Sequence, residues 1–278
     1  MSLIINLAPT GLIPTRKQSP FVPLTPAEIA ADVARCAELG TSIVHLHARS
    51  EDGSASDDPA VFADIIHRVR TNNPDIIITT TTSGRVVQDI ERRAGTLYLK
   101  GDVKPDMASL TLGSMNFATE ASVNSPSTIM RLAELMLKNG IRPELEVFDI
   151  GMINFAKILI QKGLIEAPYY FNFILGNPAT AQATLLHLAT MINDLPAQSF
   201  WSLGGIGRFQ TKANALGIVM GDGVRVGLED NLWLDDDRQH LASNLTLVER
   251  IVAQAKAQGR AIATPKEVRA QLGLQAAP

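Results

Sequence analysis

Two histidines one residue apart are the first feature of this sequence that could carry chemistry. His45 and His47 flank Leu46 in the apolar run Ser42–His47, a pattern typical of a β-strand. Side chains at alternate strand positions point to the same face, so the two imidazoles share one side. Imidazoles that converge on one point are typical of a divalent metal site, most often zinc. The alternative is that both histidines are structural, one of them in a buried polar network.

A third metal ligand is expected at the end of another strand, and Glu229 suits this place. A catalytic zinc takes three protein ligands and keeps one position open. Glu229 ends an apolar run that begins at Val224, and two histidines with one glutamate are a known catalytic zinc set. The other histidines fall in helical patterns, where structural or surface roles are expected: His67, His187 and His240. A helix cap or a loop salt bridge is the alternative for Glu229.

Asp230 and Arg225 form a candidate acid–base pair beside the metal ligands. Asp230 directly follows Glu229, and Arg225 lies in the same strand pattern. One carboxylate can bind metal while its neighbour, held ionised by a guanidinium, accepts a proton. We therefore expect Asp230 and Arg225 to be catalytic.

Hydroxyl side chains gather at the ends of two further predicted strands. They are Thr79, Thr80, Thr81, Thr82, Ser83, Ser109 and Thr111. Hydroxyls at such positions can line a polar mouth. Thr82, Ser109 and Thr111 are candidates for substrate binding. For Thr79 and Thr80 the ordinary role of a β-branched strand former is the better default.

A glycine-rich turn after another strand is a candidate phosphate site. Gly205, Gly207 and Arg208 stand in the sequence Gly-Gly-Ile-Gly-Arg. A turn of this kind at a helix N-terminus, with an arginine, suits a phosphate group. Glycine is also simply what a tight turn needs, so the motif alone is weak.

The elements that must position these residues alternate regularly between strand and helix. Short β-branched runs predict strands at Leu3–Ala8, Ser42–His47, Asp75–Thr81, Met107–Leu112, Pro143–Phe148, Tyr169–Leu175, Ser199–Leu203 and Val224–Leu228. Longer periodic runs predict helices at about 25–39, 59–72, 86–99, 126–139, 151–163, 179–194, 209–220 and 236–258, and a short one after Thr264. Alternation of this kind is the signature of βα units and a parallel sheet.

Eight strands, each followed by a helix, predict a single (β/α)8 barrel (TIM barrel) domain over residues 1–278. Its active site is expected at the carboxyl ends of the strands. Closure places the last strand beside the first, with the His45 strand next, so that Glu229 can reach both histidines. An open doubly wound sheet is the competing fold. It calls for a glycine-rich phosphate loop after the first strand, which the sequence Ala-Pro-Thr-Gly at Ala8–Gly11 does not provide.

Composition narrows the class of protein. The 278 residues carry 25 Lys+Arg and 28 Asp+Glu, a formal net charge of −3, which argues against a dedicated nucleic-acid binder. No apolar run reaches the ~18–20 residues of a membrane span, and the first residues do not have the pattern of a secretory signal. The single cysteine, Cys36, cannot form an internal disulfide and is expected to be a small core residue. A cytoplasmic enzyme is therefore expected.

These segments together resemble the β-keto acid cleavage enzyme family, over essentially the whole chain. The resemblance rests on Val-His-Leu-His at Val44–His47, Gly-Ile-Gly-Arg at Gly205–Arg208 and Arg-Val-Gly-Leu-Glu-Asp-Asn at Arg225–Asn231. Four further segments also match the family: Ala8–Gly11, Leu24–Glu28, Pro105–Leu110 and Pro143–Val147.

The resemblance implies a zinc-dependent (β/α)8 barrel that converts a β-keto acid and acetyl-CoA into acetoacetate and a new acyl-CoA. By position, it makes His45, His47 and Glu229 the zinc ligands, and Asp230, oriented by Arg225, the base. Thr81 stands where the family has a serine in the catalytic site, and Ser109 where its type member has a threonine. The family also implies a homotetramer. Two rival functions remain: another metal-dependent barrel enzyme, either a hydrolase or an aldolase, and a ligand-binding barrel without activity.

One departure from the family concerns the substrate. Family members that act on amino-bearing keto acids have a glutamate in the loop after the first strand, where this chain has Ile13. Isoleucine cannot pair with an ammonium group, and a buried unpaired charge is costly. We therefore expect Ile13 to contact an uncharged acyl tail. A second departure is Ser83, where the family usually has glycine.

Overall fold

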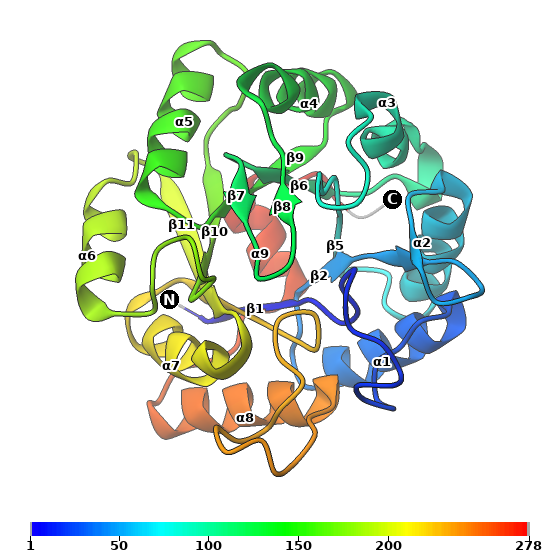
Figure 1. Ribbon diagram of the computed structural model, residues 1–278, viewed down its shortest axis with the longest axis vertical. Coiled ribbons are helices and arrows are strands. Elements are labelled where there is room, and N and C mark those ends of the chain that lie inside the picture. The colour runs from blue at the N-terminus through cyan, green and yellow to red at the C-terminus, as the bar shows by residue number, and fades with distance from the viewer. Residues whose placement is uncertain (1, 277–278) are drawn as a thin grey trace.

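The long strands of the chain form one closed parallel barrel, into which Figure 1 looks. The computed structural model describes residues 2–276. The barrel strands are β1 (Ile4–Leu7), β2 (Ile43–Leu46), β5 (Ile77–Thr80), β6 (Met107–Thr111), β9 (Arg142–Val147), β10 (Tyr169–Leu175), β11 (Ser199–Gly205) and β12 (Gly223–Val226). Strand β1 pairs with β12 on one side and with β2 on the other. The predicted barrel is confirmed, and the open doubly wound sheet is wrong, because this sheet has no free edge.

Helices surround the barrel and connect its strands (Figure 1). They are α1 (Pro26–Glu38), α2 (Pro59–Asn72), α3 (Ile90–Arg93), α4 (Pro126–Asn139), α5 (Ile150–Gln161), α6 (Leu185–Asn193), α7 (Gln210–Met220), α8 (Asn244–Ala257) and α9 (Pro265–Leu272). Several begin at the predicted signals. Thr25 and Glu28 form a complete capping box with Pro26 at the first helical position, an arrangement that satisfies otherwise unpaired N–H groups.

Two predicted helices are shorter than expected. The segment 86–99 contains only α3 and a 3₁₀ turn at Gly95–Tyr98. Gly95 sits tightly against Pro59, where an added Cβ would lie 2.8 Å from the proline ring, so packing against α2 prevails over helical periodicity. The last long helix begins at Asn244 rather than at 236, because the Ser243 side chain accepts a hydrogen bond from the Thr246 N–H and caps the helix there.

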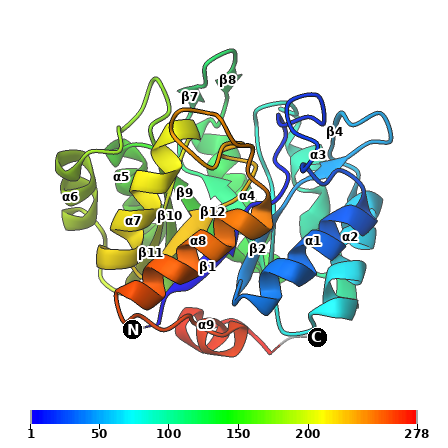
Figure 2. The same ribbon diagram turned by 90° about the horizontal axis from the view of Figure 1, so that it is seen from below.

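Two small hairpins were not predicted. One pairs β3 (Ala48–Arg49) with β4 (Ala55–Ser56), and the other pairs β7 (Met115–Asn116) with β8 (Ala121–Ser122). Strands of two residues are too short to leave a periodic signal in the sequence. Both hairpins stand at the carboxyl end of the barrel strands, as Figure 2 shows, and so they help to shape the mouth.

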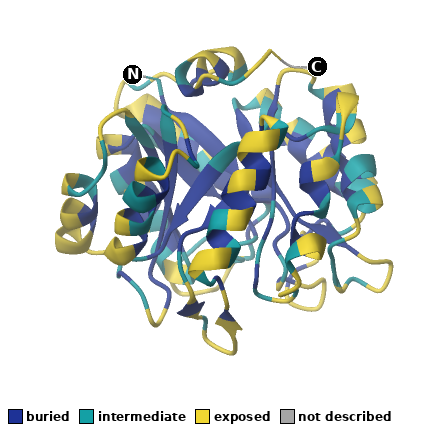
Figure 3. Ribbon diagram, turned by 90° about the horizontal axis from the view of Figure 1, so that it is seen from above, coloured by how far each residue is buried: buried dark blue, intermediate teal, exposed yellow. Residues whose placement is uncertain are grey.

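The barrel interior is apolar at one end. At the amino ends of the strands, a buried cluster joins barrel side chains to α9: Ile4, Ile43, Ile77, Met107, Tyr170, Val268 and Leu272. Figure 2 shows α9 lying across this end. In Figure 3 the barrel strands are buried, whereas exposed residues gather on the outer helices and the loops. The opposite end of the barrel is therefore left for a site.

Arg269 ties α9 to the barrel floor. Its guanidinium donates to Asp106 Oδ1 at 2.7 Å and to the main-chain oxygens of Asp75 and Ile76 at 3.1 Å, with the arginine 6% exposed. We expect Arg269→Met to lower the free energy of unfolding by about 2 kcal/mol, because buried main-chain oxygens lose their donor while Arg70 still pairs with Asp106. Urea denaturation measures this loss. The exposed Arg68, which pairs with Asp64 on α2, is the matched control, since Arg68→Met should cost under about 0.5 kcal/mol.

Two expectations from composition can be compared with the structure. Cys36 is fully buried in α1, where desolvation raises the pKa of its thiol; it is a core residue, as predicted. Within residues 2–276, none of the helices combines the length and the apolar character needed to cross a membrane.

Candidate active site

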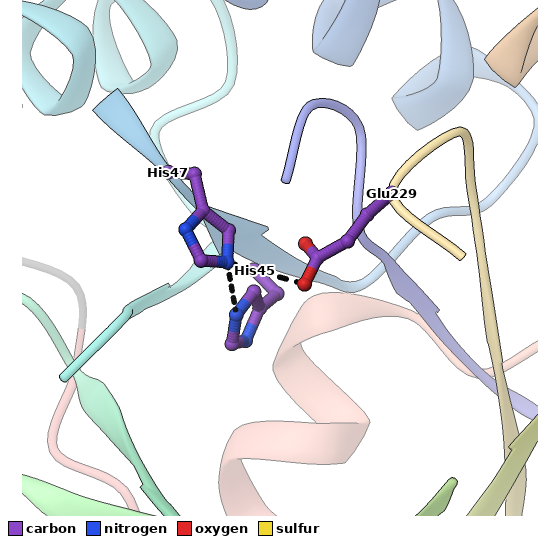
Figure 4. Close-up of side chains that lie close together, drawn as sticks. All are labelled: His45, His47 and Glu229. Atoms are coloured by element: carbon purple, nitrogen blue, oxygen red, sulfur yellow. Dashed lines mark hydrogen bonds and ion pairs between the residues drawn. The ribbon is translucent and has the colours of Figure 1, made fainter. Parts of the chain in front are cut away.

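The two histidines and Glu229 converge at the mouth of the barrel, as Figure 4 shows. The Nε2 atoms of His45 and His47 lie 3.2 Å apart, and Glu229 Oε1 lies 3.1 Å from His47 Nε2. All three ligand atoms lie within 4.8 Å of one another. His45 belongs to β2, and His47 and Glu229 lie just beyond the ends of β2 and β12. Barrel closure thus brings together residues separated by 182 positions.

The spacing of these atoms fits a tetrahedral metal. Two ligands about 2.0–2.1 Å from a tetrahedral zinc lie about 3.3 Å from each other, close to both separations around His47 Nε2. Glu229 Oε2 is buried and has no hydrogen-bond partner among the described residues. A buried carboxylate oxygen of this kind is costly unless a cation or a donor meets it. His45, His47 and Glu229 could therefore hold a divalent cation.

Glu144 orients His45 from behind. Its Oε2 lies 2.6 Å from His45 Nδ1, and both side chains are buried. Hydrogen bonding to Nδ1 leaves Nε2 turned toward His47, which is the arrangement that a metal ligand requires. Burial lowers the pKa of His45, but the Glu144 carboxylate outweighs this and raises it to about 9. Burial lowers the pKa of His47. The pocket thus attracts positive charge to His45 and keeps His47 neutral.

Glu144 is itself held by a buried polar layer. Its Oε1 accepts hydrogen bonds from the side-chain amides of Asn6 and Asn172. Below them, the Tyr170 hydroxyl hydrogen-bonds with Ser202 at 2.8 Å. Glu144 was not among the predicted site residues, although its alternation with Glu146 in a β-strand pattern was a signal that two carboxylates share one face.

We expect Glu144→Gln to weaken metal binding about 10–100-fold, because residues that orient a ligating histidine contribute that much to affinity. The substitution keeps the size of the side chain and removes its charge. Competition with a chelating dye measures the dissociation constant. An exposed glutamate on α4, Glu134, supplies the matched control as Glu134→Gln. Unchanged affinity in Glu144→Gln would show that His45 needs no orienting carboxylate.

Arg225 connects three carboxylates at the same end of the barrel. Its Nε donates to Asp230 Oδ2 and its Nη2 to Glu229 Oε1, both at 2.8 Å. Its Nη1 lies 3.5 Å from Glu146 Oε1, and Glu146 accepts a hydrogen bond from Thr111. The guanidinium is 2% exposed. One buried cation therefore fixes the relative positions of Glu229 and Asp230.

The carboxylates beside Arg225 differ in their affinity for protons. Burial raises the pKa of Glu229, but His47 and Arg225 prevail and hold it well below its ordinary value. Burial raises the pKa of Asp230, and Arg225 only partly offsets the effect. Burial also raises the pKa of Glu146. Glu229 is thus the carboxylate that stays anionic, and Asp230 has the stronger affinity for a proton, which is a property of general bases.

A cavity of about 350 Å³ lies over these groups and opens to solvent. It is lined by most of the predicted site residues: Ile13, His45, His47, Thr81, Thr111, Gly207, Arg225, Glu229 and Asp230. Its outer wall is largely apolar and includes Leu12, Met115, Phe117 and Trp233. Arg85 also lines the cavity, where it stacks on Phe117 and pairs with Glu120. The cavity can hold a small polar substrate with an apolar tail.

Four predicted site residues lie outside the cavity lining. Thr82 and Ser109 bond to each other, since the Thr82 hydroxyl donates to Ser109 O at 2.6 Å and the Thr82 N–H donates to Ser109 Oγ at 3.1 Å. Gly205 is buried against Phe209. Arg208 is exposed and stands over the Phe209 ring, at 5.3 Å from its centre. In this structure Thr82 and Ser109 therefore join the loop after β5 to β6, rather than face the cavity.

Comparison with known sequences agrees with this geometry. The sequence model of the beta-keto acid cleavage enzyme family matches residues 2–274. The chain is 41% identical over 276 residues to a 3-keto-5-aminohexanoate cleavage enzyme of Fusobacterium nucleatum, with 98% of each chain covered. It is 36% identical to a 3-oxoadipate:acetyl-CoA acetyltransferase of Cupriavidus necator, over 98% of this chain and 94% of that one.

Among solved structures, the chain is similar to apo ObcA, with a TM-score of 0.80 and 21% sequence identity. The match covers 92% of this chain but 66% of ObcA, so it supports the barrel fold alone. The family match and the two relatives extend over nearly the whole chain. This chain therefore belongs to the beta-keto acid cleavage enzyme family.

Proposed function

We propose that this protein uses a bound zinc ion to convert a β-keto acid and acetyl-CoA into acetoacetate and the acyl-CoA of the original acyl group. The carbon between the keto and carboxylate groups bonds to the acetyl carbon of acetyl-CoA. The freed CoA thiolate then takes the original acyl carbon, so that one carbon–carbon bond forms and one breaks. The convergence of His45, His47 and Glu229 beside Asp230 in one cavity is the observation that carries this proposal.

The residues of the chain have separate tasks in this reaction. His45, His47 and Glu229 would hold the zinc, which supplies positive charge where negative charge develops on the keto oxygen. Asp230 takes a proton from the carbon between the keto and carboxylate groups, and returns it to the same carbon when the original acyl group leaves. Arg225 keeps the Asp230 carboxylate aimed into the cavity through its hydrogen bond to Oδ2.

Hydroxyl groups and the glycine-rich turn complete the proposed site. Thr81 and Thr111 line the cavity and can donate hydrogen bonds to substrate oxygens, with Thr81 in the catalytic position that the family resemblance implies. Thr82 and Ser109 support the substrate site through the contacts that they make with each other. Gly205, Gly207 and Arg208 begin the segment before α7, and we propose that CoA phosphates bind along this edge.

Ile13 is the residue that we propose contacts the acyl tail of the substrate. Ile13 lines the cavity near Leu12 and is 42% exposed. An apolar wall favours an uncharged tail and disfavours an ammonium group, which would lose its hydration without gaining a partner. We therefore propose an uncharged tail, although one relative is named for an amino-bearing keto acid.

We expect Ile13→Glu to shift the preference toward 3-keto-5-aminohexanoate. A carboxylate at this position would pair with the ammonium group and would be left unpaired by a neutral tail. The ratio of kcat/KM for the aminated acid to that for 3-oxohexanoate should rise at least about tenfold. Steady-state kinetics with both acids measures this ratio, and Ile13→Gln, which has the same size but no charge, is the control. Preference of the wild-type protein for the aminated acid would contradict the proposed tail.

The reaction itself is tested by its dependence on the thioester. Purified protein loaded with zinc is incubated with a panel of β-keto acids, with and without acetyl-CoA, and acetoacetate and acyl-CoA are quantified by mass spectrometry. The proposal requires both products in equal amounts and only with acetyl-CoA. Breakdown of the keto acid without acetyl-CoA would instead favour a metal-dependent hydrolase or aldolase.

We also propose that the protein acts as a cytoplasmic homotetramer, as the family resemblance implies. Large apolar side chains on the outer helices offer surface for contacts between copies. Leu185 and Leu186 on α6 are 70% and 74% exposed, and Val219 and Met220 on α7 are 62% and 64% exposed. Light scattering coupled to gel filtration tests the assembly, and a mass of one chain would contradict it.

A further inference from the structure

A buried arginine at the barrel mouth takes no part in the proposed chemistry. Arg49 lies in the short strand β3, two residues after His47, and is 4% exposed. No ion pair with a carboxylate is found for it among residues 2–276. Burial lowers the pKa of its guanidinium, so placing this side chain in the interior has a cost. The free energy lost by desolvating the guanidinium must be offset by hydrogen bonds in the interior.

Arg49 donates hydrogen bonds to main-chain oxygens of two loops. Its Nε donates to Gly11 O at 2.8 Å, and its Nη2 donates to Pro14 O at 2.9 Å. Its Nη1 donates to Gly53 O, in the turn of the β3–β4 hairpin, at 2.9 Å. The rigid fork of the guanidinium fixes all three oxygens relative to one another, which a flexible ammonium group does not do.

The two oxygens in the first loop stand on either side of Leu12 and Ile13. Leu12 and Ile13 line the cavity, together with Pro14 and Gln18 of the same loop. Gly11 packs directly on the metal-site glutamate, since an added Cβ would lie 2.6 Å from Glu229 Cγ, and its φ of +65° is one that favours glycine. The segment between Gly11 and Pro14 is therefore held at both of its ends by one side chain, in contact with Glu229.

We propose that Arg49 is a positioning residue that holds the Gly11–Pro14 segment as the wall of the acyl-tail pocket and so sets the selectivity for the tail. This inference rests on the proposed function, because it assigns to that wall a role in choosing the substrate. Arg49 is not among the residues that line the cavity, although it donates a hydrogen bond to Pro14, which is one of them. It acts through Leu12 and Ile13.

A second buried arginine provides a matched comparison. Arg93 is 5% exposed and donates to the main-chain oxygens of Thr82 and Val123 and to Asn124 Oδ1. It therefore ties the loop after β5 to the segment after the β7–β8 hairpin. None of these three hydrogen bonds reaches the loop after β1, so loss of Arg93 should leave the Gly11–Pro14 segment in place.

The first test measures the segment directly and needs no activity. Arg16 and Lys17 are exposed trypsin sites two and three residues beyond Pro14. In Arg49→Met, cleavage after these residues should become at least about tenfold faster, because local opening exposes the chain to the protease. Mass spectrometry follows these two bonds. Arg93→Met should cleave there at the wild-type rate.

The second test measures selectivity within one variant. For Arg49→Met, kcat/KM should fall at least about tenfold more for 3-oxooctanoate than for 3-oxopentanoate, since the two acids differ in how much tail the wall contacts. Zinc content should stay at the wild-type level. Arg49→Lys keeps the charge but not the fork. It should show both effects to a smaller degree, and it keeps the proposal testable if Arg49→Met does not fold.

The two tests distinguish failure of the role proposed for Arg49 from failure of the proposed function. Unchanged cleavage after Arg16 and Lys17, or equal losses for the two acids, would overturn the role of Arg49. If the wild-type protein instead shows no acetyl-CoA-dependent turnover of either acid, the proposed function fails, and the cleavage rate then decides alone whether Arg49 holds the segment.

Discussion

Replacing Asp230 with asparagine is expected to lower kcat about 10³-fold, in the range found for loss of a general base. Asparagine has nearly the same shape, and its side-chain oxygen can still accept the hydrogen bond that Arg225 donates. It cannot take a proton from carbon. Because Asp230 is not among the three metal-binding groups, zinc content should be unchanged. Single-turnover assays with saturating β-keto acid and acetyl-CoA measure the effect.

Proton exchange isolates the step that Asp230 performs. In D₂O without acetyl-CoA, the wild-type protein should catalyse incorporation of deuterium at the carbon between the keto and carboxylate groups, followed by NMR. Asp230→Asn should reduce this exchange to the uncatalysed rate. Asp64→Asn, at an exposed aspartate of α2, is the matched control and should exchange like the wild type. Exchange at the wild-type rate in Asp230→Asn would remove Asp230 from the role of base.

Replacing His45 with alanine is expected to remove the metal and with it the activity. His45 supplies one of the three ligand atoms and is the one that Glu144 orients. A tetrahedral site that loses one of three protein ligands retains too few to bind zinc tightly. Elemental analysis should find about one zinc per chain in the wild-type protein and little in the variant. Acetyl-CoA-dependent turnover should fall below detection.

The control for His45→Ala is a histidine outside the site. His240 lies in the loop after β12, with its side chain 78% exposed and paired with Asp235. His240→Ala should retain wild-type zinc and activity. A wild-type protein that takes up no zinc on reconstitution, or a His45→Ala variant that keeps its zinc, would contradict the proposed metal site.

The barrel could be predicted from the sequence because the signals that begin and end its strands and helices are local. The capping boxes at Thr25 and Thr264 start α1 and α9 where expected. Each depends on two side chains three residues apart. The loops over the mouth were harder, because 236–243 has a helical pattern of its own. In the structure Ser243 caps α8 and Arg238 has a φ of +57°, so that segment lies outside the helix.

The candidate site also has features that the sequence predicts and features that it does not. The shared direction of His45 and His47 follows from the two-residue period of a strand, and barrel closure alone was enough to bring Glu229 within reach. The partner of His45 was not predictable, because Glu144 lies 99 residues away. Its alternation with Glu146 indicates only that the two carboxylates share a face of the strand. Thr82 and Ser109 resembled substrate-binding hydroxyls, yet in the structure they bond to each other.

The sequence by itself thus determined the order of strands and helices, their caps and the pairing of His45 with His47, since these depend on residues within a few positions of each other. Only the tertiary structure decided which carboxylate orients His45, which hydroxyls face the cavity and which loop Arg49 holds. The physical reason is that these contacts join different strands and loops, which lie 27 to 99 residues apart in the chain. Such groups come within hydrogen-bond distance only when the strands pair side by side in the barrel.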